Sequence, residues 1–338
     1  MTPPELNTRT TATVNLVPQL GLDGAPCLVA IVKQRFAFDR SGVVRREPGA
    51  QLRLVDEPWD PEAEQSSIRL PGDLCLRKPS TDVVVSGSAI SPQRKPVKEL
   101  DVSVRVGPVS KRLKVFGTRV WSPGVARMTL SAPRPFVELS LRWEDAFGGL
   151  DTSDPKKPAH EPRNPLGKGV AADPRTLEHQ PGPRIEDPDD LISSDRSRPE
   201  PAGVGAIGPQ FEARLRYAGT YDDRWQKERM PLPPLDFDER HNQVAAPGLI
   251  APAYLRGGEP VELVGLHDEG PLRFSLPKLA FNATAHAARG KQEYRPVLDL
   301  VLLEPNERIF ELGWRCCIKV PKRARDLPAV SVFEKEWR

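Results

Sequence analysis

The sequence predicts a mainly β protein: an antiparallel β-sandwich or barrel-like architecture with few short helices and one long proline-rich insert. The 338 residues include 38 prolines, roughly twice the average usage. A proline inside a helix removes a hydrogen-bond donor and clashes with the preceding turn, so long helices are disfavoured. Apolar and polar residues alternate along several short segments, which is the period of a strand. Glycine and proline separate these segments, as expected for turns between strands.

The individual strands follow from this alternation or from short apolar runs. Residues 100–106 alternate most clearly and predict a half-buried strand. Residues 27–32 are a continuous apolar run, which makes them a further strand candidate. The strand candidates, in chain order, are 27–32, 83–85, 100–106, 112–116, 136–143, 261–264 and 297–302.

One helix is predicted, with Thr220 as its N-cap and Arg229 near its end. Acidic residues come first and basic residues later, an order that suits the helix dipole. Tyr221 and Trp225 are four residues apart, so a helix would place them on one face. Pro231 is expected to end it.

The chain is expected to contain one large or two fused β domains. We divide it into an N-terminal β region (1–149), an insert (150–209) and a C-terminal β region with the short helix (210–338), the two β regions packing as one unit. The insert has eleven prolines and few large apolar residues, so we expect a flexible flap or an extended binding segment with little core. Residues 203–208 match Gly-x-Gly-x-x-Gly, but no strand precedes them and Pro209 follows, so we expect a flexible turn there.

Composition argues against several classes of function. The 49 basic and 46 acidic residues give a net charge of only +3, which is weak support for nucleic-acid binding. The four cysteines, at positions 27, 75, 316 and 317, lack metal-ligand spacing and predict buried free thiols in a reducing compartment. No leader and no run of eighteen apolar residues is present, so we expect a cytoplasmic protein without membrane insertion. No cofactor motif is present, and the oligomeric state cannot be read from the sequence.

Candidate catalytic groups are the paired carboxylates Glu144–Asp145 and Asp236 with Asp238. Such pairs occur in glycosidases, and a carbohydrate-active hydrolase on a β scaffold is therefore the alternative function. Acids that cap turns or pair with arginines are the commoner case. The five histidines are scattered and match no zinc or nucleophile motif. The sequence therefore predicts a protein that is not an enzyme.

The most informative feature is a pair of glycine-rich turns, at 143–149 and 164–169. Glycine enters positive φ without steric cost, so such turns hold neighbouring side chains in fixed positions. Their aromatic residues are either core residues or anchors for a partner; the adjoining turns favour the second alternative for Phe147. The candidate partner-binding residues are Trp143, Phe147, Gly148, Gly149, Asn164, Pro165, Gly167, Tyr221 and Trp225.

These two turns resemble a signature of a bacterial domain-of-unknown-function family encoded beside type VI secretion effectors and PAAR-like spike-tip proteins. Further stretches resemble the family in the same order: 78–83, 117–121, 218–225, 229–231, 236–238 and 274–277. The resemblance implies an adaptor or chaperone that escorts a PAAR-like protein or its toxic effector to the secretion spike. A structural component that stays in the secreted particle is the variant of this interpretation. Because the cargo family is β-rich, pairing at an exposed strand edge is the geometry we expect.

Overall fold

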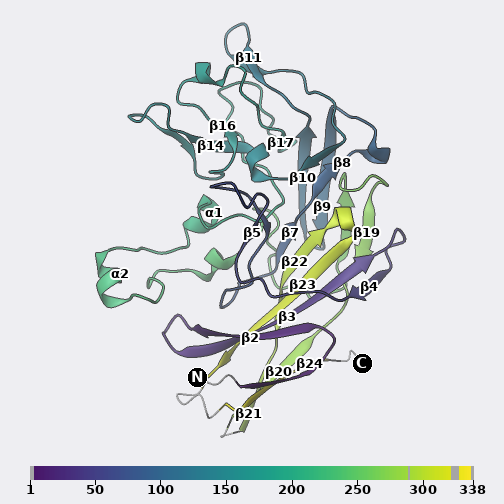
Figure 1. Ribbon diagram of the computed structural model, residues 1–338, viewed down its shortest axis with the longest axis vertical. Helices are drawn as coiled ribbons and strands as arrows, with labels where there is room; N and C mark the ends of the chain where they lie inside the picture. Colours follow the sequence, from purple (N-terminus) through teal and green to yellow (C-terminus); the bar gives the residue numbers. More distant parts are fainter. Residues whose placement is uncertain (1–3, 288–289, 321–326, 336–338) are drawn as a thin grey trace.

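The computed structural model describes residues 4–287, 290–320 and 327–335. Strands make up 42% and helices 8% of the fold, so the prediction of a mainly β protein is confirmed. Figure 1 shows the strands in several sheets, joined by long loops. Within these ranges the helical segments are α1 (Glu212–Leu215), α2 (Asp223–Glu228) and five 3-10 turns, η1 (Pro92–Arg94), η2 (Trp143–Asp145), η3 (Pro174–Leu177), η4 (Glu239–Asn242) and η5 (Pro305–Glu307).

A six-stranded sheet forms the centre. Its strand order is β2 (Thr13–Leu20), β3 (Pro26–Phe38), β23 (Ile309–Lys319), β22 (Val297–Glu304) and β7 (Asp82–Val85), with β4 (Val44–Glu47) paired to β3. Only the β22–β7 pair is parallel. The sheet therefore joins the two ends of the chain, since β3 lies near the start and β23 near the end.

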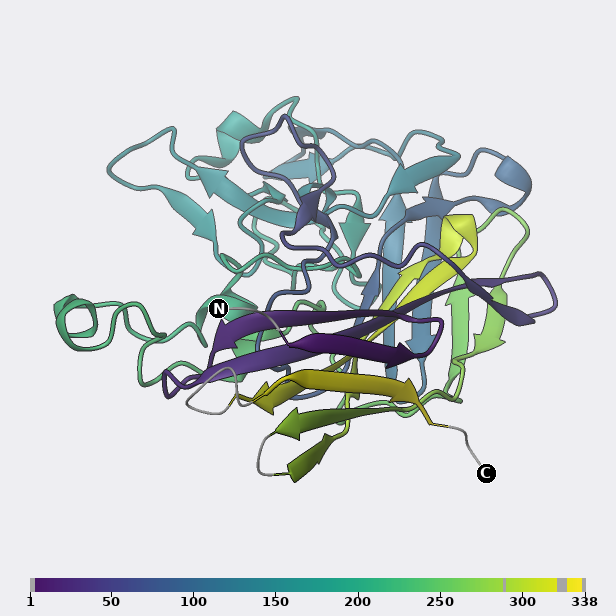
Figure 2. The same ribbon diagram turned by 60° about the horizontal axis from the view of Figure 1, so that its bottom comes forward.

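Two further sheets flank the central one, in the arrangement seen in Figures 1 and 2. The five-stranded sheet is antiparallel, in the order β17 (Ile185–Glu186), β10 (Val109–Phe116), β9 (Glu99–Val106), β18 (Pro260–Val264) and β19 (Leu272–Ser275). The four-stranded sheet has the order β1 (Glu5–Arg9), β24 (Ala329–Glu334), β20 (Phe281–Ala287) and β21 (Gly290–Tyr294). Phe274 of the five-stranded sheet stacks on Phe38 of β3, with ring centroids 4.2 Å apart. Phe281 of the four-stranded sheet contacts Trp314 of β23, with ring centroids 4.9 Å apart.

Four small sheets complete the described fold. One has three strands, β15 (Ala159–Glu161), β14 (Phe147–Asp151) and β16 (Lys168–Gly169). The two-stranded sheets are β5 (Glu57–Pro58) with β6 (Ile68–Leu70), β8 (Ser88–Ile90) with β13 (Glu138–Ser140), and β11 (Trp121–Pro123) with β12 (Met128–Leu130).

Most predicted strands are present, and two local predictions need correction. Residues 136–143 were expected to form one strand, but only Glu138–Ser140 do, because η2 begins at Trp143. The predicted helix exists but starts later than expected. Its N-cap is Asp222, whose side chain accepts a hydrogen bond from the Trp225 N–H at 2.8 Å. Thr220 instead binds the carboxylate of Asp236.

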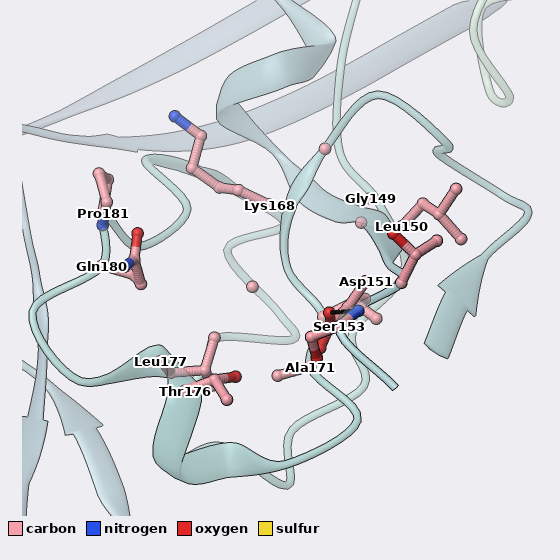
Figure 3. Close-up of a pocket in the computed structure, with 15 residues that line it drawn as sticks. Gly149, Leu150, Asp151, Ser153, Lys168, Ala171, Thr176, Leu177, Gln180 and Pro181 are labelled. Carbon is pink, nitrogen blue, oxygen red and sulfur yellow. Dashed lines mark hydrogen bonds between the residues drawn. The ribbon is translucent and has the colours of Figure 1, made fainter. Parts of the chain in front are cut away.

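The insert (150–209) contributes to the core, contrary to the composition-based expectation. It forms β15, β16, β17 and η3 and lines a groove (Figure 3). Its last residues are buried, and the main-chain N–H of Val85 donates to the carbonyl of Val204 at 3.0 Å. Small side chains explain this burial. A Cβ atom at Gly203 would lie 2.7 Å from the Trp143 ring, so glycine lets this segment pass against the indole. Residues 203–208 are thus a buried packing segment and not a flexible turn.

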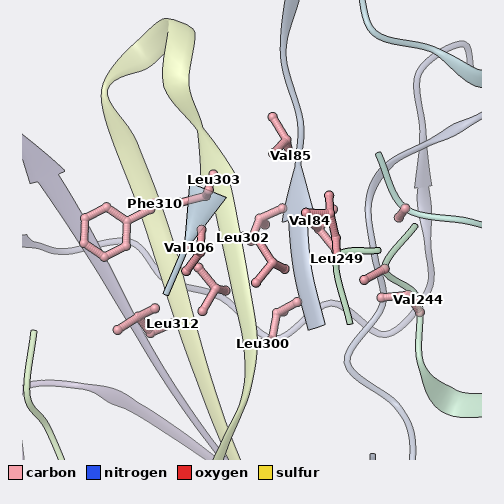
Figure 4. Packing of buried hydrophobic residues seen from close by; sticks show 14 of the residues in the cluster. Val84, Val85, Val106, Val244, Leu249, Leu300, Leu302, Leu303, Phe310 and Leu312 are labelled. Atoms are coloured by element: carbon pink, nitrogen blue, oxygen red, sulfur yellow. The ribbon is translucent and has the colours of Figure 1, made fainter. Parts of the chain in front are cut away.

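The main apolar core lies on one face of the β3–β23 pair. Side chains alternate along a strand, and Leu28, Ala30 and Val32 belong to the main core cluster together with Phe310 and Trp314 of β23. Figure 4 shows neighbouring strands adding Val106 from β9, Leu302 from β22 and Val84 from β7. The twofold alternation of β3 and β23 therefore directs one set of residues into a shared core between the sheets.

The opposite face of the same strand pair buries charges. Lys33 of β3 is 0% exposed, and its ammonium group lies 2.7 Å from both Asp73 and Glu311. Arg53 also binds Glu311, at 2.7 Å. A second pair, Arg315 and Asp299, lies at 2.5 Å. Because a buried charge is tolerated when it is paired and hydrogen-bonded, this network ties the loop that carries Arg53 and Asp73 to the sheet.

We expect Lys33→Met to lower the free energy of unfolding by about 3–5 kcal/mol, because it leaves two buried carboxylates without their shared cation. Arg112→Met is the matched control: Arg112 and its partner Asp189 are exposed, and breaking such a pair costs about 0–1 kcal/mol. Urea unfolding of both variants measures the difference. Equal losses would contradict the role given to Lys33.

Candidate functional site

The two glycine-rich turns meet at one buried residue, Asn164. Its side-chain N–H groups donate to the carbonyls of Trp143 at 2.9 Å and Phe147 at 3.0 Å. The main-chain carbonyl of Asn164 accepts a hydrogen bond from the N–H of Gly149 at 2.9 Å. Asn164 therefore satisfies main-chain groups of residues 143–149 that burial would otherwise leave unpaired. We call residues 143–149 with 164–169 the glycine joint.

Glycine is required where the two turns cross. Gly148 and Gly149 have φ values of +148° and +103°, a region that side chains with a Cβ avoid. A Cβ at Gly148 would collide with the carbonyl oxygen of Asn164, and one at Gly149 with that of Gly167. At Gly167 it would lie 2.7 Å from the carbonyl oxygen of Ala146. The main chains thus approach as closely as glycine allows, which fixes β14 against β16.

Charge supports the same joint. The Asp145 carboxylate is buried and binds Lys168 at 2.9 Å and Arg184 at 2.6 Å. Burial alone would raise the pKa of the Asp145 carboxyl, but hydrogen bonds from Arg184 and Lys168 outweigh it and hold the pKa below its usual value. Asp145 therefore stays ionised at neutral pH and links η2, β16 and the loop before β17.

Trp143 and Phe147 are core residues. Phe147 is 2% exposed and so is Trp143. The Trp143 indole N–H donates to the carbonyl of Ala206 at 3.1 Å, and its ring contacts Phe211 edge to face at 5.3 Å. The interpretation of Phe147 as an exposed anchor is therefore wrong. Phe147 begins strand β14, and the glycine turns leave its side chain buried. Pro165 and Gly167 are half-buried.

A groove of about 470 Å³ lies beside the glycine joint. In Figure 3 Leu150, Asp151 and Ser153 lie on one side and Gln180 and Pro181 on the other. Asp151 accepts hydrogen bonds from the N–H groups of Ser153 and Ala172, both at 2.9 Å. The walls are therefore mainly main chain held by turns, and Leu150 is an exposed apolar side chain at the edge.

Tyr221 and Trp225 come together elsewhere, on a projecting lobe. We define the lobe as residues 217–242; Figures 1 and 2 show it extending away from the sheets at α2. The two rings meet edge to face with centroids 4.6 Å apart. Tyr221 is 57% exposed and Trp225 is half-buried, while Met230 and Leu235 are also exposed. The lobe therefore carries the accessible aromatic surface that was expected at the glycine joint.

The lobe is held by specific hydrogen bonds. The Trp225 indole N–H donates to the carbonyl of Leu232 at 2.8 Å. Arg229 donates to the carbonyl of Pro233 at 2.8 Å and also to that of Leu22, in the turn between β2 and β3. A cavity of about 450 Å³ opens between α2 and residues 234–236. Trp225 is thus positioned by a main-chain contact, and the exposed Tyr221 packs against it.

The candidate catalytic carboxylates all have structural partners. Glu144 accepts hydrogen bonds from the N–H and hydroxyl of Ser67. Asp236 accepts from the N–H and hydroxyl of Thr220. Asp238 caps η4 and binds Arg240 at 2.6 Å. These contacts suit turn-capping acids, the commoner alternative for such residues.

Sequence reasoning missed the buried charged residues. Lys78 and Asp82 form an ion pair at 2.9 Å that is almost fully buried. Burial alone would lower the pKa of Lys78, but the carboxylates of Asp82 and Asp299 raise it above its ordinary value. A signal was available: Lys33, Asp299 and Arg315 each interrupt an apolar strand run. Such a charge must find a partner inside the fold.

The described residues hold no group of three or more histidine, cysteine or acidic side chains placed to bind a metal ion. The four cysteines are free thiols, but the expected burial holds fully for Cys27 alone: Cys75 and Cys316 are half-buried, and Cys317, near the end of β23, is exposed. No helix in the described ranges is long and apolar enough to cross a membrane.

We expect Gly149→Ala to lower the free energy of unfolding by roughly 3 kcal/mol or more. Alanine is strained at the positive φ of this position, and its methyl group would also collide with the carbonyl oxygen of Gly167. Gly270→Ala is the control. Gly270 has φ +100° and nothing within 4 Å of its Cβ position. This variant should therefore lose only about 1–2 kcal/mol of unfolding free energy, from the backbone strain of a positive φ. Thermal and urea unfolding compare the two. A Gly149→Ala protein as stable as Gly270→Ala would contradict the close approach.

Comparison with known proteins identifies the family. A family model described as an uncharacterized protein conserved in bacteria (DUF2169) matches residues 23–315. No curated protein and no solved structure matches the chain. The matched range includes the glycine joint and the lobe. Because it covers most of the 338 residues, this chain belongs to the DUF2169 family.

Proposed function

We propose that this protein is a type VI secretion adaptor, a chaperone that binds a PAAR-like protein or its toxic effector and escorts it to the secretion spike without catalysing a reaction. The proposal rests on the resemblance of residues 78–83, 143–149, 164–169 and 218–225 to the family described above. It places the protein in the cytoplasm, where cargo would be loaded. Nucleic acid and membrane insertion have no part in it.

The observation that carries the proposal is the exposed aromatic surface of the lobe. Tyr221 is 57% exposed and rests on Trp225. Rigid aromatic side chains lose little conformational freedom on binding and dominate the energy of many interfaces. Exposed Met230 and Leu235 lie on the same lobe and extend its apolar surface. Tyr221, Trp225 and Met230 fall within two of the stretches that carry the resemblance, 218–225 and 229–231.

The glycine joint has a supporting part in this proposal. Its buried aromatics and Asn164 hold the insert, and its groove offers main-chain groups and Leu150 as a second contact area. A cargo strand could also pair with an open sheet edge such as β21, whose residues are mostly exposed. In this mechanism the adaptor covers apolar cargo surface until the cargo docks on the spike.

Co-expression with the PAAR-like protein or effector encoded beside this gene is expected to raise the amount of soluble cargo and to yield a complex that survives gel filtration. Expression of the cargo alone is the control. Mass spectrometry of proteins recovered from the native host identifies the partner. An isolated protein that hydrolyses glycosides at ordinary enzymatic rates would instead favour the hydrolase alternative.

Tyr221→Ala is expected to weaken cargo binding by about 2 kcal/mol or more, as loss of an aromatic anchor does. Its melting temperature should barely change, because the side chain is largely exposed. Phe147→Ala is the contrasting variant: Phe147 is buried, so truncation should cost about 3–5 kcal/mol of stability. Calorimetric titration with cargo and thermal unfolding are measured on both. Unchanged affinity in a well-folded Tyr221→Ala protein would exclude the lobe as the binding surface.

A further inference from the structure

A cavity of about 350 Å³ lies beside α1. It is separate from the groove beside the glycine joint and from the cavity between α2 and residues 234–236. Its polar side chains include Arg214 of α1, Lys78 and Asn242. Its apolar side chains include Leu54, Val55 and Leu74, all of which are exposed at its mouth. The volume lies in the range of small-ligand sites, which are typically apolar with a few placed polar groups.

Arg214 is unusual among the buried cations of the described residues. It is 9% exposed, and its recorded hydrogen bonds go to main-chain carbonyls, from Nε to His241 at 2.9 Å and from Nη1 to Ile207 at 2.8 Å. The other buried cations, Lys33, Lys78, Arg119 and Arg315, each pair with a carboxylate. In the described part of the chain Arg214 forms no salt bridge. A guanidinium has five donors in a planar fork suited to a carboxylate, and Nη2 remains for a ligand.

Among the described residues that line the cavity, Arg214 is the cation without an ion pair. Lys78 is neutralised by Asp82, and Arg315 by Asp299. The remaining lining carboxylate, Asp56, is exposed and accepts the N–H of Gly72 at 2.7 Å. Burial lowers the pKa of Arg214, an effect that Asp56 and Asp82 only partly offset. A buried cation without an ion-pair partner gains most from an anion that enters from solvent.

We propose that this cavity binds a carboxylate carried by an apolar group, with Arg214 receiving the carboxylate and the mouth formed by Leu54, Val55 and Leu74 covering the apolar part. A free apolar acid and the C-terminal residue of a peptide share this chemistry. The site does not depend on the adaptor function, because it uses none of the lobe residues Tyr221, Trp225 or Leu235.

The test uses the full chain and four probes in calorimetric or NMR titrations. N-acetyl-leucine carries the carboxylate, and N-acetyl-leucinamide is its neutral match. The third probe is a short peptide that ends in leucine with a free C-terminal carboxylate. The fourth is the same peptide with its C-terminus amidated and with an internal aspartate, which keeps a carboxylate away from the terminal leucine. We expect both probes with a terminal carboxylate on leucine to bind about 10-fold or more tightly than their amidated matches, as charge-assisted hydrogen bonds imply. If only N-acetyl-leucine binds, the source is a free acid.

Variants at the mouth place the ligand without disturbing the buried contacts of Arg214. Val55→Glu adds a negative charge at an exposed position and should weaken carboxylate binding by roughly two- to fivefold, while Val55→Gln is its neutral control. Asp56→Asn keeps an acceptor for Gly72 and should tighten binding by a similar factor. Melting temperatures verify that each variant is folded.

Two results would overturn the proposal. One is the failure of both leucine carboxylates to bind, or their binding no better than the amides. The other is carboxylate binding that stays the same in Val55→Glu and Asp56→Asn, since the ligand would then lie outside this cavity. Loss of binding in Arg214→Met counts as support only if that variant melts like the parent protein, because its guanidinium also holds two main-chain carbonyls.

Discussion

The fold depends on the pairing of β3 with β23, because this pair is buried on both faces. Eleven residues of β23 pair with β3, which joins the first and last parts of the chain in one sheet. One face supplies Val32, Phe310 and Trp314 to the apolar core. The other face carries Lys33 and Glu311, both of which are buried. Charges in that position need partners from elsewhere, so the loop with Arg53 and Asp73 must cover them.

The glycine joint allows two main-chain segments, residues 143–149 and 164–169, to approach each other more closely than side chains with a Cβ atom would permit. Asn164 replaces the hydrogen bonds that a regular sheet would provide, and Gly148 and Gly149 remove the Cβ atoms that would keep the segments apart. This explains why such a motif looks like a binding signature in the sequence. Aromatic residues beside strained turns are common in recognition loops, but here the turns direct Trp143 and Phe147 into the core. The motif therefore encodes a joint between the insert and the sheets.

The sequence predicted local features well and long-range ones poorly. Alternation identified β9, β10 and β22 because a strand with one buried face repeats every two residues. The proximity of Tyr221 and Trp225 followed from their spacing, even though the helix begins after Tyr221. The insert was misjudged because composition counts its prolines but cannot show that the segment around Val204 pairs with Val85 and passes the Trp143 ring. Burial there depends on contacts between residues 60 and 119 positions apart, which a single sequence does not reveal.

Packing contacts connect the glycine joint to the cavity beside α1. Trp143 of the joint packs on Phe211, the N-cap residue of α1, and Arg214 lies within that helix. Arg214 in turn holds the carbonyl of Ile207, in the segment that passes the Trp143 ring. Joint, segment and helix are therefore one set of mutual contacts, and the position of the guanidinium is fixed by packing that starts at the glycine turns. The lobe is attached to this set through His241, whose carbonyl accepts from Arg214 Nε, and to the turn between β2 and β3 through Arg229 and the carbonyl of Leu22. Tyr221 takes no part in these contacts and is exposed, which separates the residue proposed for recognition from those that hold the core.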